Sequence, residues 1–69
     1  MRFDDLRAVL LQLEFSERIR GSHHIFVRDD FEEIINIQPT ENGKAKPYQV
    51  KQTRNLIVKY RLKGFDDEV

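Results

Sequence analysis

The sequence has no cysteine, no tryptophan and no long apolar run. Without cysteine the chain can form no disulfide framework, no thiolate metal site and no thiol nucleophile, so the composition does not indicate an oxidising compartment. The longest apolar run, Ala8 to Leu11, is far shorter than the roughly 18 residues of a membrane span. The first five residues show no apolar signal-peptide core. The sequence therefore predicts a cytoplasmic protein that does not associate with a membrane.

The charges are balanced in number but not in position. The 69 residues carry 12 Lys+Arg and 12 Asp+Glu. Residues 18–28 and residues 42–63 contain basic residues and no acidic one, whereas residues 29–41 contain acidic residues and no basic one. A basic segment is usually a solvated surface, but it is also the feature that a polyanionic ligand requires. Two segments of this neutral chain are therefore candidates for phosphate contacts.

Hydrophobic spacing and turn residues predict five elements in a single domain. Phe3, Leu6, Leu10 and Leu13 recur at helical spacing, so we expect a helix over residues 4–13, capped by Asp4 or Asp5. Alternating and β-branched stretches predict strands over residues 15–20, 22–28 and 32–38, with Gly21 at the first turn and an Asp29-Asp30 tight turn at the second. A second helix is expected to begin at Pro47 and to end at Gly64.

This order of elements defines the expected fold class. It is an α+β fold of order αβββα, in which a three-stranded antiparallel sheet has two helices on one face and an open second face. A chain of this size buries only roughly 60% of the surface that it exposes when unfolded, so the core must be thin. We expect residues 1–65 to form the domain and residues 66–69 to be an acidic, solvated tail.

The two adjacent histidines are the sharpest chemical feature. They follow Gly21 and Ser22 at the start of the second strand, and neighbouring side chains on a strand point to opposite faces. His24 shares the parity of the apolar Phe26, so His24 belongs on the covered face and His23 on the open face. An imidazole there can exchange a proton near neutral pH and so assist attack by a ribose 2′-hydroxyl on a phosphodiester. The simpler alternative is that both histidines are surface or packing residues.

Three segments together resemble a known family. They are Gly21-Ser22-His23-His24-Ile25-Phe26, a strand that ends near Pro39, and Gly43-Lys44-Ala45-Lys46-Pro47 before a basic last helix. Over nearly the whole chain this pattern resembles the HicA toxins of bacterial type II toxin–antitoxin systems. The resemblance implies a fold similar to a double-stranded RNA-binding domain, mRNA interferase activity, and a HicB-type antitoxin that blocks the site. One departure is Glu14, which stands where the family usually has a glycine.

The predicted site combines both lines of reasoning. His23 is the expected catalytic residue, and Gly21 and Ser22 belong to the same motif. The expected phosphate contacts to mRNA are Arg18, Arg20, Lys44, Lys46 and Lys51. Adjacent strand histidines project apart and the chain has no cysteine, so we assign no metal, and we assign no cofactor. Two alternatives remain open: a non-catalytic RNA-binding module, and an inactive chain that serves as the partner of an antitoxin.

Overall fold

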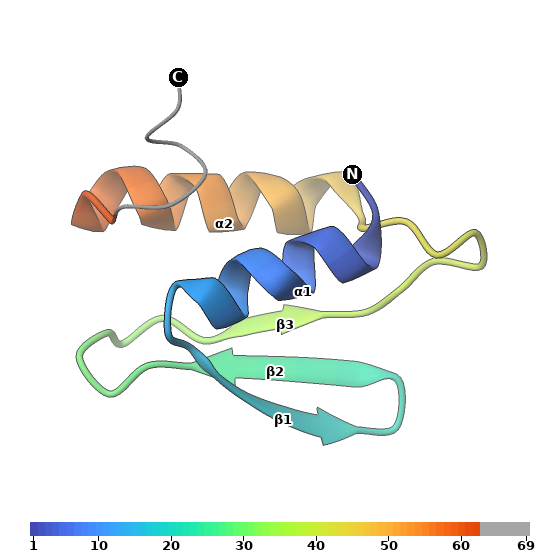
Figure 1. Ribbon diagram of the computed structural model, residues 1–69, viewed down its shortest axis with the longest axis horizontal. Coiled ribbons are helices and arrows are strands. Elements are labelled where there is room, and N and C mark those ends of the chain that lie inside the picture. The colour runs from blue at the N-terminus through green and yellow to red at the C-terminus, as the bar shows by residue number, and fades with distance from the viewer. Residues whose placement is uncertain (63–69) are drawn as a thin grey trace.

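The computed structural model describes residues 1–62 and contains two helices and one three-stranded antiparallel sheet. The elements are α1 (Phe3–Gln12), β1 (Ser16–Arg20), β2 (His23–Val27), β3 (Ile35–Ile37) and α2 (Pro47–Tyr60). The strand order is β1-β2-β3, and both helices lie on the same side of the sheet (Figure 1). The α+β fold and the order αβββα predicted from the sequence are confirmed. The expected acidic tail, residues 66–69, lies outside the described residues.

The core fills the space between the helices and the sheet. Phe26 of β2 and Ile35 and Ile37 of β3 are fully buried, and residues between them are exposed or only partly buried. This alternation assigns one face of the sheet to the core. The other buried apolar residues are Phe3, Leu6, Leu10, Leu13, Phe15, Ala45, Leu56 and Ile57.

The first hairpin has the two-residue turn that its sequence favours. Arg20 pairs with His23, so Gly21 and Ser22 form the whole connection. Gly21 has a φ of 60°, while Ser22 is outside the left-handed region, which is the arrangement of a type II′ turn with glycine first. A Cβ added at Gly21 would meet no atom within 4 Å, so the backbone conformation and not a steric contact requires glycine here.

The second hairpin differs from the prediction. The expected turn at Asp29-Asp30 is present, closed by a hydrogen bond of 3.1 Å from Phe31 N–H to the Arg28 carbonyl. The expected strand over residues 32–38 is shortened to Ile35–Ile37, so the turn is part of a longer connection over residues 28–34. Arg28 holds this connection, since its guanidinium donates to Asp30 at 2.9 and 2.7 Å and to the Leu13 carbonyl at 2.8 Å. These contacts direct the chain towards the helices before it can extend the ladder with β2.

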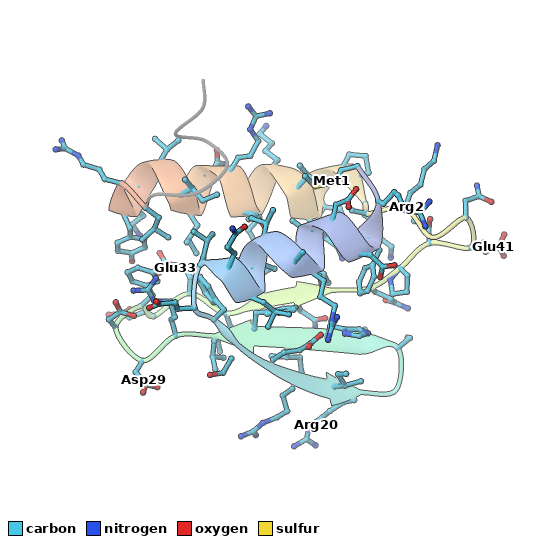
Figure 2. All side chains as sticks on the ribbon, viewed as in Figure 1. Met1, Arg2, Arg20, Asp29, Glu33 and Glu41 are labelled. Atoms are coloured by element: carbon cyan, nitrogen blue, oxygen red, sulfur yellow. The ribbon has the colours of Figure 1, made fainter. Side chains whose placement is uncertain are left out.

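Side chains from this connection bind it to the end of α2. Phe31 stacks on Tyr60 with ring centroids 4.0 Å apart, and the Arg28 guanidinium lies 4.4 Å from the Phe31 centroid. Glu33 accepts hydrogen bonds of 2.6 Å from Lys59 Nζ and from Tyr60 Oη. The hydrogen bond from Lys59, followed by that from Tyr60, lowers the pKa of Glu33 from 4.5 to about 2. Figure 2 shows Glu33 between the sheet and this end of α2.

The start of α1 is also different from the prediction. Arg2 is the N-cap residue, and neither Asp4 nor Asp5 caps the helix through its side chain, although both lie in the first turn. Main-chain pairing with the segment before α2 holds this end instead, since Phe3 N–H donates to Gly43 and Ala45 N–H donates to Met1. Such pairing orients the helix start without a side-chain cap. The acidic residues in the first turn still interact favourably with the helix dipole.

Both helices end in a Schellman motif with a non-glycine residue in the left-handed conformation. After α1, Phe15 N–H donates to Leu10 and Glu14 N–H to Leu11, with Glu14 at φ 71°. Glu14 therefore adopts the conformation that glycine would favour. The buried side chains of Phe15 and Leu10 provide the apolar contact that accompanies this motif.

The same motif ends α2 earlier than predicted. Leu62 N–H donates to Ile57 and Arg61 N–H to Val58, with Arg61 at φ 53°. The helix therefore ends at Tyr60 and not at Gly64, which lies outside the described residues. Leu62 packs against the core cluster that includes Ile57, and this contact explains the earlier end.

We expect Glu14→Gly to stabilise the protein. The left-handed conformation costs a residue with a Cβ about 1 kcal/mol or more, and glycine removes this cost at the expense of a more flexible unfolded chain. A net gain of about 0.5–1 kcal/mol would raise the melting temperature by several degrees, measured by circular dichroism. Glu14→Ala is the control, because it removes the carboxylate but keeps the strain. An equal rise in both variants would contradict the explanation.

We expect Glu33→Gln to lower the melting temperature at neutral pH and to weaken its dependence on acid. The wild-type carboxylate has a lowered pKa, so its stabilisation is present above 4.5 and is lost as the pH falls towards about 2. The variant lacks this contribution at every pH, so its melting temperature should fall less over the same range. Glu32→Gln, at an exposed neighbouring carboxylate, should behave like the wild type. If the melting temperatures of all three proteins fall equally with decreasing pH, the stabilising role of the Glu33 carboxylate is contradicted.

Candidate functional site

The two adjacent histidines lie on opposite faces of the sheet, as strand alternation predicts. His23 is exposed on the face away from the helices. His24 is partly buried on the helix side, where its ring meets the edge of Phe3 at a centroid distance of 4.8 Å and an angle of 71°. The exposed imidazole of His23 is therefore the one that a macromolecule can approach.

His24 belongs to a charged cluster that joins β1 and β2 to α1. Its Nδ1 lies 2.7 Å from Glu17 Oε2, and Arg7 of α1 donates to both oxygens of Glu17 at 2.6 and 2.7 Å. The hydrogen bond from Arg7 is the main cause of the lowered pKa of Glu17, and the bond to His24 acts in the same direction. His24 therefore has a structural role, as a packing residue with an ionised partner.

A hydrogen bond orients the ring of His23. Its Nδ1 lies 3.2 Å from Oδ1 of Asn36, the middle residue of β3. Because an amide oxygen only accepts, Nδ1 is the donor in this contact, and in the neutral ring the lone pair is then on Nε2. A ring held in this way can accept a proton at Nε2. Sequence reasoning missed Asn36, since its only signal was a polar residue between two buried isoleucines.

The turn that precedes His23 is tied to the end of β3. Gln38 Nε2 donates to Ser22 Oγ at 3.0 Å. In Figure 1 this turn lies at the same end of the molecule as the connection from β3 to α2. Ser22 therefore contributes to the predicted motif by joining two segments that flank His23.

A groove between β3 and α2 opens next to His23. Its volume is about 290 Å³. We call it the β3–α2 groove, and its lining residues are His23, Ile34, Asn36, Gln38, Tyr48, Gln49 and Gln52. Gln49 is buried, and its Nε2 donates a long hydrogen bond of 3.4 Å to the Asn36 carbonyl at the outer edge of β3. The helix thus covers a sheet edge with a polar side chain.

The predicted basic residues of β1 are on the same face of the sheet as His23. Arg20 is paired with His23, and Arg18 is paired with Ile25 one row further along. Figure 2 shows Arg20 projecting away from the helices. Arg20 is therefore a direct neighbour of the imidazole. Arg18 and Arg20 also border a hollow of about 300 Å³ whose other lining residues are Ile25, Val27 and Ile34.

The predicted lysines are placed less closely. Lys51 lines a second hollow that shares Tyr48 and Gln52 with the β3–α2 groove, so the two lie next to each other. Lys46 is the N-cap residue of α2, and Lys44 pairs with Arg2 in an isolated bridge. Within residues 1–62, no hydrogen bond or ion pair links these lysines to His23.

Two further properties concern membranes and metals. In the part of the chain that the structure describes, neither helix is long and apolar enough to cross a membrane. Over the same residues, no group of three His, Asp or Glu side chains is arranged to hold a metal ion.

Comparison of the chain with protein-family models, curated proteins and solved structures found no match.

We expect nitrogen NMR spectra at alkaline pH to show His23 predominantly as the Nδ1–H tautomer, because Nδ1 donates to Asn36. Asn36→Ala removes the acceptor and should shift the population towards the Nε2–H tautomer. The tautomer of His24 should not change, because its partner is Glu17. A His23 tautomer that is the same in both proteins would contradict the role of Asn36.

Proposed function

We propose that the protein is an endoribonuclease that cleaves mRNA in the cytoplasm, as the toxin of a type II toxin–antitoxin system. The observation that carries the proposal is the exposed imidazole of His23, oriented by Asn36 and next to Arg20 on the open face of the sheet. A proton acceptor next to a guanidinium is the minimum that phosphodiester cleavage through the ribose 2′-hydroxyl requires. The resemblance to HicA toxins supports the same assignment.

The chemistry is an internal transfer at phosphorus. Nε2 of His23 accepts the proton of the 2′-hydroxyl, whose oxygen attacks the adjacent phosphorus. The bond from phosphorus to the 5′-oxygen breaks, which leaves a 2′,3′-cyclic phosphate and a 5′-hydroxyl. Water supplies the proton to the leaving oxygen. A site with one acid–base side chain predicts modest turnover.

Basic residues next to His23 and at the start of α2 are suited to hold the RNA backbone. Arg20 can contact the phosphate that reacts, and its planar guanidinium suits two oxygens of the developing charge. Lys46 and Lys51 lie at the start of α2, where they can bind neighbouring phosphates. These contacts are independent of sequence and position the strand.

The partner that we propose is a HicB-type antitoxin. The hollow bordered by Arg18 and Arg20 combines positive charge with exposed apolar side chains, of which Ile34 is 60% exposed. An antitoxin with acidic and apolar side chains would find complementary groups there. Bound in this position it would cover Arg20 and block access to His23.

The decisive experiment compares cleavage of mRNA by the wild type and by His23→Ala in the presence of a chelator. We expect the wild type to cleave and the variant to lose activity by about 100-fold or more, the usual contribution of a general acid–base group. The products should carry a 2′,3′-cyclic phosphate. His24→Asn is the matched control, since Nδ2 of asparagine can still donate to Glu17 from the covered face, and it should remain active.

Equal cleavage by the wild type and by His23→Ala would contradict the proposal. RNA binding without cleavage by the wild type would instead indicate the alternative, a non-catalytic RNA-binding module. Because His23 is exposed and makes a single side-chain hydrogen bond, its replacement should leave the fold intact. Circular dichroism spectra of the variant would show this directly.

A further inference from the structure

The β3–α2 groove is chemically different from the basic surfaces around it. Asn36, Gln38, Gln49 and Gln52 surround it with side-chain amides, and His23 is the only titratable nitrogen base in its lining. Phosphates are bound by cations, whereas base edges are read by neutral donors and acceptors such as asparagine and glutamine. A groove with this lining is suited to a nucleobase.

Tyr48 provides a surface on which a base can stack. It is 63% exposed although it is a large aromatic residue, and no aromatic ring among residues 1–62 stacks on it. It lines both the β3–α2 groove and the adjoining hollow that contains Lys51. Unpaired RNA bases commonly stack on exposed aromatic rings next to basic residues. A strand could therefore pass from His23 across Tyr48 towards Lys51.

Gln49 adds an unused acceptor to the groove lining. The residue is 2% exposed, and its Oε1 accepts no hydrogen bond from any residue that the structure describes. A buried carbonyl without a donor costs free energy that a ligand with an N–H group can recover. The Nε2 of Gln49 already donates to the Asn36 carbonyl at 3.4 Å and to Tyr48 Oη at 3.5 Å, so Gln49 can offer a base only its carbonyl oxygen. Adenine has an amine donor for that oxygen and a ring nitrogen acceptor beside it, the pair that the complete amide of Gln52 can match.

We propose that the β3–α2 groove binds one unpaired adenine of RNA, stacked on Tyr48 and read by the Gln49 carbonyl oxygen and the Gln52 amide. The inference rests on the proposed function, which makes RNA the ligand, and it adds a preferred base. Since His23 lines the same groove, the adenine would lie beside the bond that is cleaved. Cleavage should then occur preferentially next to adenine in single-stranded regions.

The binding test uses the full chain with His23→Ala, so that RNA is not consumed. Fluorescence anisotropy compares a labelled uridine hexamer with the same RNA that has one central adenosine. A third RNA has purine riboside in place of adenosine and so lacks the amine. We expect the adenosine RNA to bind about 5-fold or more tightly than the other two, the usual value of a matched amide–base pair.

Variants of α2 then show which residues cause the preference for adenosine. Tyr48→Ala should weaken binding of the adenosine RNA by about 5- to 150-fold, the usual contribution of a stacked base, whereas Tyr48→Phe should preserve it. Gln52→Ala should reduce the difference between adenosine and uridine. Val58→Ala, at a 68% exposed residue of the same helix outside this groove, is the control and should bind like the parent protein.

The outcomes separate this inference from the proposed function. If the wild-type protein prefers adenosine RNA but does not cleave RNA, adenine binding in the groove is supported and the nuclease activity is contradicted. If the protein cleaves RNA without a preference for adenosine, adenine binding in the groove is contradicted and the nuclease activity remains supported. A preference that survives Tyr48→Ala would overturn the inference, because the base would then be read elsewhere. Failure to bind any of the three RNAs would contradict both.

Discussion

The alternation of side chains along β2 is the constraint on which the rest of the site depends. Phe26 is fully buried beneath the helices, so His24 must share its face and His23 must point the other way. A slip of one residue would exchange the two histidines. The Gly21–Ser22 turn prevents this slip, because a two-residue connection fixes Arg20 opposite His23. The position of the proposed proton acceptor thus follows from a buried phenylalanine and a tight turn.

Sequence reasoning predicted what depends on local pattern and missed what depends on distant partners. The order of elements, the start of α2 at Pro47 and the faces of the two histidines follow from periodicity and turn chemistry. The length of β3 does not, because Arg28 and Phe31 direct that connection through contacts with residues far along the chain. The partners of both histidines were missed for the same reason. Glu17 and Asn36 are unremarkable in sequence, and only the strand register brings them to the rings.

The basic residues that form ion pairs are different from the basic residues proposed to contact RNA. Glu17 is bound to Arg7, Asp30 to Arg28 and Glu33 to Lys59, and each of these contacts joins or shapes structural elements. Among residues 1–62, the basic residues proposed to contact RNA form no ion pair. Those proposed contacts are Arg18, Arg20, Lys44, Lys46 and Lys51. The total charge therefore hides a division between charges used for folding and charges open to a ligand.

This division also separates stability from function in the molecule. The residues that hold the fold together lie between the helices and the sheet or at the far end of α2, as Phe26 and Glu33 do. Most residues proposed to act on RNA are exposed, as His23, Arg20 and Tyr48 are, and Gln49 is the buried exception. Exposed side chains with few contacts contribute little to the free energy of unfolding. A small domain with a thin core can therefore support a polar site on its uncovered face, because that site takes almost nothing from the packing that stabilises it.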